Sequence, residues 1–152
     1  MNEFMKVAID LSNGNKCGGP FGACIVKNGK IIGKASNRVI KNNDPTAHAE
    51  IEAIREACKT INSYDLSGCK LYTSCYPCPM CLSAIIWSNI KKVYYANTKD
   101  DASDIEFRDD AIYDFIRNGM KDDSIVSFVQ IDRESAIKEF EKYKNNIDRI
   151  EY

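Results

Sequence analysis

A single histidine, His48, and a later pair of cysteines constrain the fold of this chain more than any other feature. The histidine precedes Glu50 in the pattern His-x-Glu, and the cysteines form the pattern Pro77-Cys78-x-x-Cys81. A histidine and two cysteines at such a spacing are typical zinc ligands. Zinc ligands converge on one point, so the fold has to bring these two segments together. The chain has no other imidazole that could take the place of His48.

The local sequence indicates how the two segments can meet. Each segment lies at the beginning of a predicted helix, where the positive end of the helix dipole favours thiolate and hydroxide. Cys78 and Cys81 are three residues apart and therefore share one helix face. His48 and Glu50 both lie in the first turn of the same predicted helix. Their side chains can therefore both reach a point just beyond the N-terminal end of that helix.

The remaining sequence alternates between predicted strands and helices. Apolar residues recur at helical spacing over 4–11, and Asn28-Gly29 between two apolar runs predicts a type I′ hairpin. Asp44 before Pro45 has the pattern of an N-cap followed by proline at the first helical position. Further predicted elements are strands at 71–73, 93–95 and 125–131 and helices at 77–89, 109–117 and 136–143. This alternation predicts an α/β fold with a mixed sheet of about five strands, covered by helices on both faces.

Length and charge narrow the class of protein. A chain of 152 residues suits a single domain over 1–152, in which 145–152 form a mostly polar tail. The formal net charge of -1 predicts no general attraction to nucleic acid or anionic membranes. The sequence has neither an apolar run long enough for a membrane span nor a signal-peptide core, so we expect a cytoplasmic protein. In that compartment the 7 cysteines are expected to be thiols or metal ligands rather than disulfides.

The pattern His-x-Glu followed by Pro-Cys-x-x-Cys is the signature of zinc-dependent deaminases. A catalytic zinc has three protein ligands and keeps its fourth position for water, whose pKa it lowers to about 7. Glu50 would then take the proton of the water and return it to a ring nitrogen and the leaving amine. Each half of the signature is weak by itself, but both halves in this order in one short chain predict a hydrolytic deaminase.

Other interpretations of the same residues exist. A Cys-x-x-Cys pair in a cytosolic protein is often a structural zinc site or a redox site. Cys75 could also join His48, Cys78 and Cys81 in a closed site without catalysis, but that arrangement leaves Glu50 without a task. We therefore favour the catalytic interpretation. The other cysteines are interpreted as core or surface thiols: Cys17, Cys24, Cys58 and Cys69.

Several runs outside the zinc segments also match a known family. They include Gly18–Ala23, Asn43–Glu50, Ala53–Arg55, Ala57–Lys59, Leu71–Cys75, Pro77–Leu82, Ala84-Ile85 with Trp87, Phe107–Tyr113 and the terminal Glu151-Tyr152. On these runs the chain resembles the bacterial guanine deaminases of the cytidine deaminase superfamily. The resemblance spans nearly the whole chain. It implies one zinc ion per chain and the conversion of guanine to xanthine and ammonia.

The resemblance further implies an architecture. The fold would be a three-layer α/β/α sandwich around a five-stranded mixed sheet, of the cytidine deaminase type. The protein would be a homodimer in which the C-terminal segment, including 145–152, crosses to the partner. Tyr152 would then close over the active site of the neighbouring chain as part of a lid.

The same resemblance implies roles for residues around the zinc site. Asn37 would hydrogen-bond the purine, while Phe21, Ala49 and Trp87 would belong to the substrate pocket. Asp109 would be a second carboxylate that reads the guanine edge or helps protons reach the amine.

Each of these side chains also has a purely structural explanation. Asn37 could be a turn residue, and Phe21 and Trp87 could be core aromatics. Asp109 could be a helix N-cap, with Asp110 beside it as the alternative carboxylate. Tyr152 could be an unstructured chain end.

One departure from the family pattern bears on the substrate. The family usually has glutamate between the cysteine and the proline where this chain has Tyr76, so a carboxylate is lost and a ring is added beside the zinc ligands. The substrate could therefore be guanosine or another nucleoside, cytosine or the triazine ammeline instead of guanine. A tRNA adenosine deaminase and a zinc-stabilised binding module without catalysis are the further alternatives.

Overall fold

The computed structural model describes residues 1–152, which form two compact units, Met1–Tyr113 and Asp114–Tyr152. None of the helices combines the length and the apolar character that a membrane span requires.

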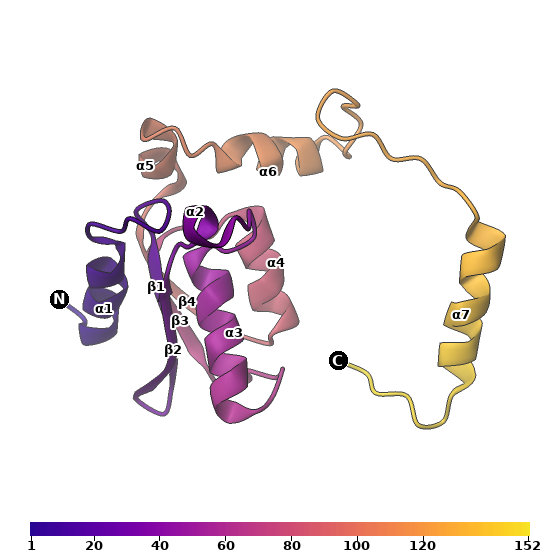
Figure 1. The fold of residues 1–152 in the computed structure, drawn as a ribbon, viewed down its shortest axis with the longest axis horizontal. Coiled ribbons are helices and arrows are strands. Elements are labelled where there is room, and N and C mark those ends of the chain that lie inside the picture. Colours follow the sequence, from indigo (N-terminus) through magenta and orange to yellow (C-terminus); the bar gives the residue numbers. More distant parts are fainter. The chain divides into compact units, whose positions relative to one another are not determined.

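A mixed sheet of four strands forms the centre of the first unit (Figure 1). The strands are β1 (Gly22–Lys27), β2 (Lys30–Ser36), β3 (Lys70–Cys75) and β4 (Lys92–Asn97). Their order across the sheet is β2-β1-β3-β4, so β2 and β4 are the edges. β1 runs antiparallel to both β2 and β3, whereas β3 and β4 are parallel.

The predicted hairpin joins β1 to β2. Asn28 and Gly29 both have positive φ angles, of 50° and 75°, which a type I′ turn requires at its two central positions. The turn closes the pair Lys27 and Lys30. The hairpin prediction is therefore confirmed.

Helices cover both faces of the sheet, as the alternation predicted. The helix α1 (Glu3–Ser12), which Asn2 caps, packs Phe4, Met5 and Val7 against Cys24, Val26 and Tyr72 on one face. The larger cluster on the other face includes α3 (Ala49–Ile61), α4 (Pro79–Trp87) and inward side chains of the strands, namely Ala23, Ile25 and Leu71. Each large apolar side chain buried here contributes about 1.5–3 kcal/mol. These three layers hold the beginnings of α3 and α4 in fixed positions.

Two short helices were not predicted from the sequence. α2 (Val39–Asn42) follows β2, and α5 (Lys99–Asp104) follows β4. A capping box starts α5, because Thr98 and Asp101 each accept a hydrogen bond from the backbone N–H of the other.

The helix predicted to begin at Asp44 and Pro45 begins later. The structure starts α3 at Ala49, with His48 as its N-cap. The Asp44 carboxylate instead accepts hydrogen bonds from the backbone N–H of Thr46 at 2.8 Å and from its hydroxyl at 2.7 Å. Asp44 therefore fixes a turn before His48, and the expected helix start is wrong.

The prediction of a fifth strand is also wrong, because residues 125–131 form no strand and the sheet has four strands. The segment has the apolar residues of a strand, but Phe128 and Ile131 are 68% and 75% exposed. A strand needs a neighbour to accept its backbone hydrogen bonds, and the structure pairs this segment with none.

The second unit buries no side chain. It contains the end of α6 (Asp109–Arg117) and the whole of α7 (Arg133–Asn145), both close to the predicted helices. Its exposed apolar residues include Ile125, Val126, Phe128, Val129, Ile131, Phe140, Ile147 and Ile150. This unit therefore has no core of its own.

Candidate zinc site and substrate pocket

The predicted zinc ligands meet at the N-terminal ends of α3 and α4. His48 is the N-cap of α3, and Cys78 is the N-cap of α4. The Nδ1 atom of His48 lies 3.6 Å from the Sγ atoms of both Cys78 and Cys81, and the three atoms lie within 4.8 Å of one another. Tetrahedral zinc with ordinary bond lengths separates such ligand atoms by about 3.5–3.8 Å. The donor types and their spacing therefore fit zinc, and the predicted convergence is confirmed.

Local sequence explains the form of the cysteine pair. Pro79 occupies the first turn of α4, and the backbone N–H of Cys81 donates to the Cys78 sulfur at 3.5 Å. Hydrogen bonds from the Cys81 thiol and then from His48 lower the pKa of Cys78 to about 4. The same contact with Cys78 raises the pKa of His48. The site thus favours a thiolate at Cys78 before any metal binds.

Cys75 is not part of this ligand group. Its thiol donates to the Thr98 carbonyl oxygen at 3.5 Å, and burial raises its pKa to about 11. The three ligand atoms that lie together belong to His48, Cys78 and Cys81. The geometry therefore favours an open three-ligand site over the closed alternative.

Glu50 lies beside the ligands in the first turn of α3. Its side chain is 6% exposed, and its Oε1 atom accepts a hydrogen bond of 3.0 Å from the hydroxyl of Thr73 on β3. Its Oε2 atom lies 3.5 Å from the sulfur of Cys81. Burial raises the pKa of Glu50, which makes its carboxylate a stronger base. Sequence analysis missed the role of Thr73, because its partner Glu50 is 23 residues away in the sequence.

A pocket of about 380 Å³, part of it open to solvent, adjoins the ligand group. Its lining consists of Phe21, Asn37, His48, Glu50, Cys75, Tyr76, Cys78, Phe107 and Asp109. The pocket thus contains two of the metal ligands, His48 and Cys78. It also contains four residues that the sequence predicts for the pocket or for catalysis: Phe21, Asn37, Glu50 and Asp109. Phe107 belongs to a run that matches the family, but the sequence assigns it no place in the pocket. It packs edge-on against Phe21 with ring centroids 4.8 Å apart, so the two rings form one wall.

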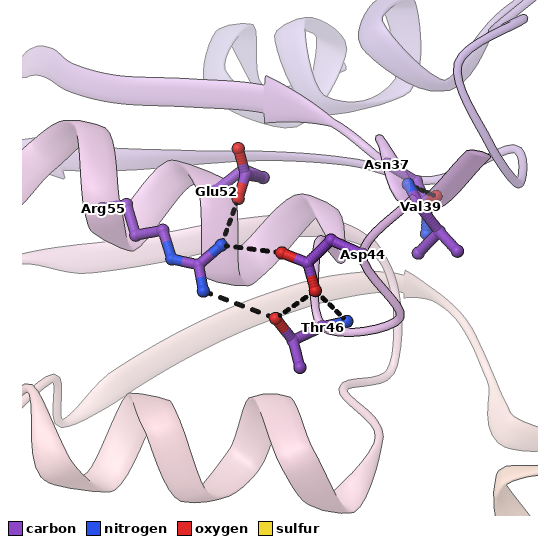
Figure 2. A network of polar contacts seen from close by, with 6 residues as sticks. All are labelled: Asn37, Val39, Asp44, Thr46, Glu52 and Arg55. Atoms are coloured by element: carbon purple, nitrogen blue, oxygen red, sulfur yellow. Dashed lines mark hydrogen bonds and ion pairs between the residues drawn. The ribbon is translucent and has the colours of Figure 1, made fainter. Parts of the chain in front are cut away.

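Asn37 is buried in the pocket wall with a fixed orientation. Its Oδ1 atom accepts a hydrogen bond of 3.1 Å from the backbone N–H of Val39, which Figure 2 shows. Only the oxygen of an amide can accept a hydrogen bond, so the oxygen is the atom turned toward Val39. The nitrogen of the amide keeps its two N–H groups for other partners.

Asp109 is the first residue of α6 and lines the pocket, whereas Asp110 does not. Burial, followed by the negative charge of Cys78, raises the pKa of Asp109. Asp110 lies 3.6 Å from Arg108, and its other oxygen is buried without a hydrogen-bond partner. The position of Asp109 at a helix start agrees with its structural explanation as well, so its catalytic role stays a prediction.

Tyr76, the departure from the family pattern, belongs to an aromatic group beside the pocket. Its ring packs edge-on against Tyr95 at 5.0 Å, and the Lys99 ammonium lies 5.6 Å from its centroid. The same ammonium lies 5.3 Å from the ring of Tyr113, whose hydroxyl donates to the Pro77 carbonyl at 2.9 Å. The ring of Tyr76 is therefore held by two contacts rather than standing free in the pocket.

Three predicted pocket residues lie elsewhere. Trp87 is 68% exposed at the far end of α4 from the cysteines, because a helix of 9 residues separates its ends by about 13 Å. Ala49 is fully buried in the core cluster rather than in the pocket lining. The pocket lining includes neither Trp87 nor Ala49, so their contact with the substrate stays a prediction. Tyr152 ends the second unit and is 81% exposed.

Figure 2 shows a polar network around the turn that precedes His48. Arg55 on α3 contacts Glu52 at 2.5 Å, Asp44 at 3.7 Å and the Thr46 hydroxyl at 3.4 Å. Exposed ion pairs of this kind are each worth less than about 1 kcal/mol. Together they tie the turn to the helix that begins with the zinc ligand.

Comparisons with known proteins agree with this geometry. A family model described as the cytidine and deoxycytidylate deaminase zinc-binding region matches residues 1–97. The guanine deaminase of Bacillus subtilis (strain 168) is 47% identical over 135 residues, which cover 89% of this chain and 86% of that protein. The tRNA-specific adenosine deaminase of Aquifex aeolicus (strain VF5) is 52% identical over 77 residues, 51% of each protein.

The solved structures extend the comparison to the full length. The X-ray structure of the guanine deaminase from Bacillus subtilis matches with a TM-score of 0.90 and 43% sequence identity. That match covers 100% of this chain and 99% of the other. The likeness to the Bacillus subtilis protein therefore includes both units, whereas the likeness to the tRNA-specific enzyme is limited to about half of the chain.

Proposed function

The chain belongs to the zinc-binding family of cytidine and deoxycytidylate deaminases, and from this premise we propose that it hydrolyses guanine to xanthine and ammonia. The observation that carries the proposal is the likeness to a guanine deaminase along the whole chain, with a TM-score of 0.90. The pocket beside the zinc ligands supports it, because its lining places two aromatic rings and the polar side chains of Asn37 and Asp109 around the ligand group.

Zinc, when bound to His48, Cys78 and Cys81, supplies the Lewis acid that activates a water molecule. Glu50 is the proton carrier in this proposal. Thr73 donates to its Oε1 atom, whereas Oε2 lies 3.5 Å from the sulfur of the ligand Cys81, so Oε2 is the oxygen that faces the zinc ligands and would take a proton of the water. The same atom would deliver this first proton to the ring nitrogen. It would then transfer the second proton, from the hydroxyl added at C2, to the 2-amino group, which leaves as ammonia as the C2 carbonyl forms. A raised pKa suits this exchange, because the carboxyl has to gain and lose a proton near neutral pH.

The pocket wall would hold the purine in place. Phe21 and Phe107 offer an apolar wall for the ring, and the free N–H groups of Asn37 can donate to an acceptor on it. Asp109 lies in the same pocket with a raised pKa and would hold a proton for the leaving amine. Tyr76 would limit the room beside the substrate.

We extend the proposal to a homodimer in which the C-terminal segment of one chain covers the partner. The second unit has no core of its own, and 145–152 hold the exposed Ile147, Ile150 and Tyr152. The first unit exposes Leu82, Ile86 and Trp87 on α4 and two tyrosines on the edge strand β4. Apolar surfaces on both units support their burial against a second copy. Tyr152 would then act as a lid over the partner's pocket.

The second candidate is a tRNA adenosine deaminase, favoured by the identity of 52% over 77 residues. The net charge of -1 speaks against it, because tRNA binding relies on basic surface. A small amine other than guanine, either a base or a nucleoside, is a stronger alternative than tRNA. The shape of the pocket determines which of these small substrates a deaminase accepts.

Ammonia release by the zinc-loaded protein tests the proposed substrate. The panel contains guanine, guanosine, cytosine, cytidine, adenine, ammeline and a tRNA, with Glu50→Ala as the control. We expect release from guanine that disappears in the control. Release from another amine but not from guanine would contradict the substrate while keeping the mechanism. Silence on the whole panel would favour the structural zinc module.

The dimer has its own test. Sedimentation of the full chain is expected to give twice the mass of one chain. Deletion of 114–152 is expected to give a monomer that retains zinc, because the three ligands lie in the first unit. A monomeric full chain would contradict the dimer.

A further inference from the structure

The loop before β1 carries a side-chain clamp that the proposed chemistry does not use. The Nδ2 atom of Asn15 donates two hydrogen bonds, to the Gly19 carbonyl and to the Asn37 carbonyl, both at 2.8 Å. The Oδ1 atom of Asn15 accepts from the backbone N–H of Cys17 at 3.0 Å. One half-buried amide thus uses both of its donors and its acceptor to join the loop to the residue after β2.

The clamp is connected to the pocket wall through hydrogen bonds of the backbone. The backbone N–H of Asn37 donates to the Phe21 carbonyl at 2.9 Å, so Asn37 is tied to the loop from two sides. Both Asn37 and Phe21 line the pocket. A displacement of the loop would therefore move two residues of the pocket wall together.

Gly18, in the same loop, lies against the side chain of Asn37. A Cβ atom added to Gly18 would lie 1.9 Å from the Oδ1 atom of Asn37, closer than any non-bonded contact allows. The amide of Asn37 can occupy its place only because residue 18 has no side chain. The run of small residues in this loop therefore has a steric reason that sequence analysis did not identify.

These contacts hold the side-chain amide of Asn37 in one orientation. The Val39 N–H holds the oxygen of Asn37, and Gly18 leaves room for that oxygen. The nitrogen is left as the donor of the pocket, so the amide matches an acceptor on the substrate, such as a carbonyl oxygen or an unprotonated ring nitrogen. An amino group at the same place would meet a donor and would be rejected.

We propose that Asn15 is a positioning residue for substrate selection: it clamps the loop 17–19 to Asn37 and, together with Gly18, keeps the Asn37 amide facing the pocket as a hydrogen-bond donor. This inference rests on the proposed function, because it assigns Asn37 to substrate recognition. Asn15 has no place in the chemical step itself.

The variant Asn15→Asp tests the clamp, because aspartate keeps the acceptor for Cys17 but has no N–H to donate. Asn13→Asp is the matched control, since Asn13 is exposed in the same segment and gains the same charge. With guanine as substrate, we expect Asn15→Asp to raise KM about tenfold with kcat changed less than about threefold, the pattern of lost binding without lost chemistry. Zinc content should stay at the wild-type value in both variants.

A double-mutant cycle shows whether Asn15 acts through Asn37. In the Asn37→Ala background, Asn15→Asp should lower kcat/KM less than about twofold further, since the amide that it positions is gone. Gly18→Ala is the second probe of the same amide, and it should raise KM in the wild-type background and have little effect beside Asn37→Ala. An undiminished effect of Asn15→Asp in the Asn37→Ala background would overturn the proposal, as would a parallel loss of zinc and kcat, which indicates a structural role.

The wild-type enzyme separates failure of this inference from failure of the proposed function. If the wild type releases no ammonia from guanine but acts on another amine of the panel, the proposed substrate fails and the same cycle is measured with that amine. If the wild type acts on guanine and Asn15→Asp leaves KM unchanged, the inference fails while the proposed function stands.

Discussion

The two units of this chain differ in where their apolar side chains go. The first unit, residues 1–113, contains every buried residue of the chain and packs them on both faces of its sheet. The second unit, residues 114–152, has helices of similar length but buries none of its side chains. The sequence periodicity predicts helices in both units, but only the first unit supplies a surface for its helices to pack against. Isolated helices of this length are marginal in water, so those of the second unit need a packing surface for their stability.

This difference has a functional meaning. All three zinc ligands, Glu50 and the pocket lining belong to the unit with a core, where rigid helix ends can hold ligand atoms at fixed distances. The unit without a core holds Tyr152 and many exposed apolar side chains. We expect changes in the first unit to affect the chemistry and changes in the second to affect assembly and closure of the pocket.

The largest effect is expected at the zinc ligands. Cys78→Ala should lower the zinc content from about one ion per chain to almost none and abolish activity, because two remaining ligands hold zinc poorly. Zinc analysis by mass spectrometry measures this directly. Cys75→Ala is the matched control and should retain the metal, because its sulfur lies outside the ligand group. Equal zinc loss in both variants would contradict the three-ligand site.

The next effect is expected at Glu50. Glu50→Gln should retain zinc and lose about 10²–10⁴-fold in kcat, the range for a general acid–base residue. Gln keeps the shape of the side chain and can accept from Thr73, so the variant isolates the proton transfer. Near-normal kcat in this variant would remove Glu50 from the mechanism.

Glu50 also predicts how the stability of the zinc-free protein depends on pH. Burial raises its pKa in the folded chain, so its contribution to stability is complete below the ordinary glutamate pKa and is lost as pH rises through the raised value. The zinc-free Glu50→Gln variant should therefore have a higher Tm than the zinc-free wild type at neutral pH, and the gap should close toward acidic pH. Thermal unfolding at a series of pH values measures the gap, and a gap that widens toward acid would contradict the sign.

A smaller effect is expected at Asp109. Asp109→Asn should lower kcat on guanine about 10²-fold, because the pocket loses a group that can carry a proton. Asp110→Asn serves as the control, since this neighbour does not line the pocket. Similar activities in the two variants would assign Asp109 to the start of α6 alone.

The smallest effect is expected in the second unit. Deletion of Tyr152 should raise KM for guanine a few-fold and leave zinc content unchanged, if the tail closes over the partner's pocket. Steady-state kinetics on the dimer provide the measurement. Unchanged kinetics would mean that the tail has no part in closing the pocket.

Sequence reasoning recovered the features that depend on local spacing. These features are the metal ligands, the hairpin at Asn28-Gly29 and the helix that starts at Asp109. Each of them depends on a short segment, in which capping, turn chemistry and periodicity determine the local structure. The layered α/β arrangement followed from the alternation of those elements. Features of this kind can be predicted from one sequence, because they depend on residues that are close together in the chain.

Features that depend on distant partners were missed or wrong. The contacts of Thr73 with Glu50 and of Asn15 with Asn37 join residues far apart in sequence, and nothing in either local segment indicates them. The segment 125–131 has the composition of a strand, but composition cannot supply the neighbour that a strand requires. Trp87 matched a family run, yet its position along α4 carries it away from the pocket.

The most direct test of the central claim measures product formation against bound zinc. Zinc-free protein is titrated with zinc in the presence of guanine, and xanthine and ammonia are quantified together. The account predicts equal amounts of the two products and a rate that rises in proportion to bound zinc up to about one ion per chain. Xanthine formation that is independent of zinc, or a fully loaded protein that forms none, would contradict it.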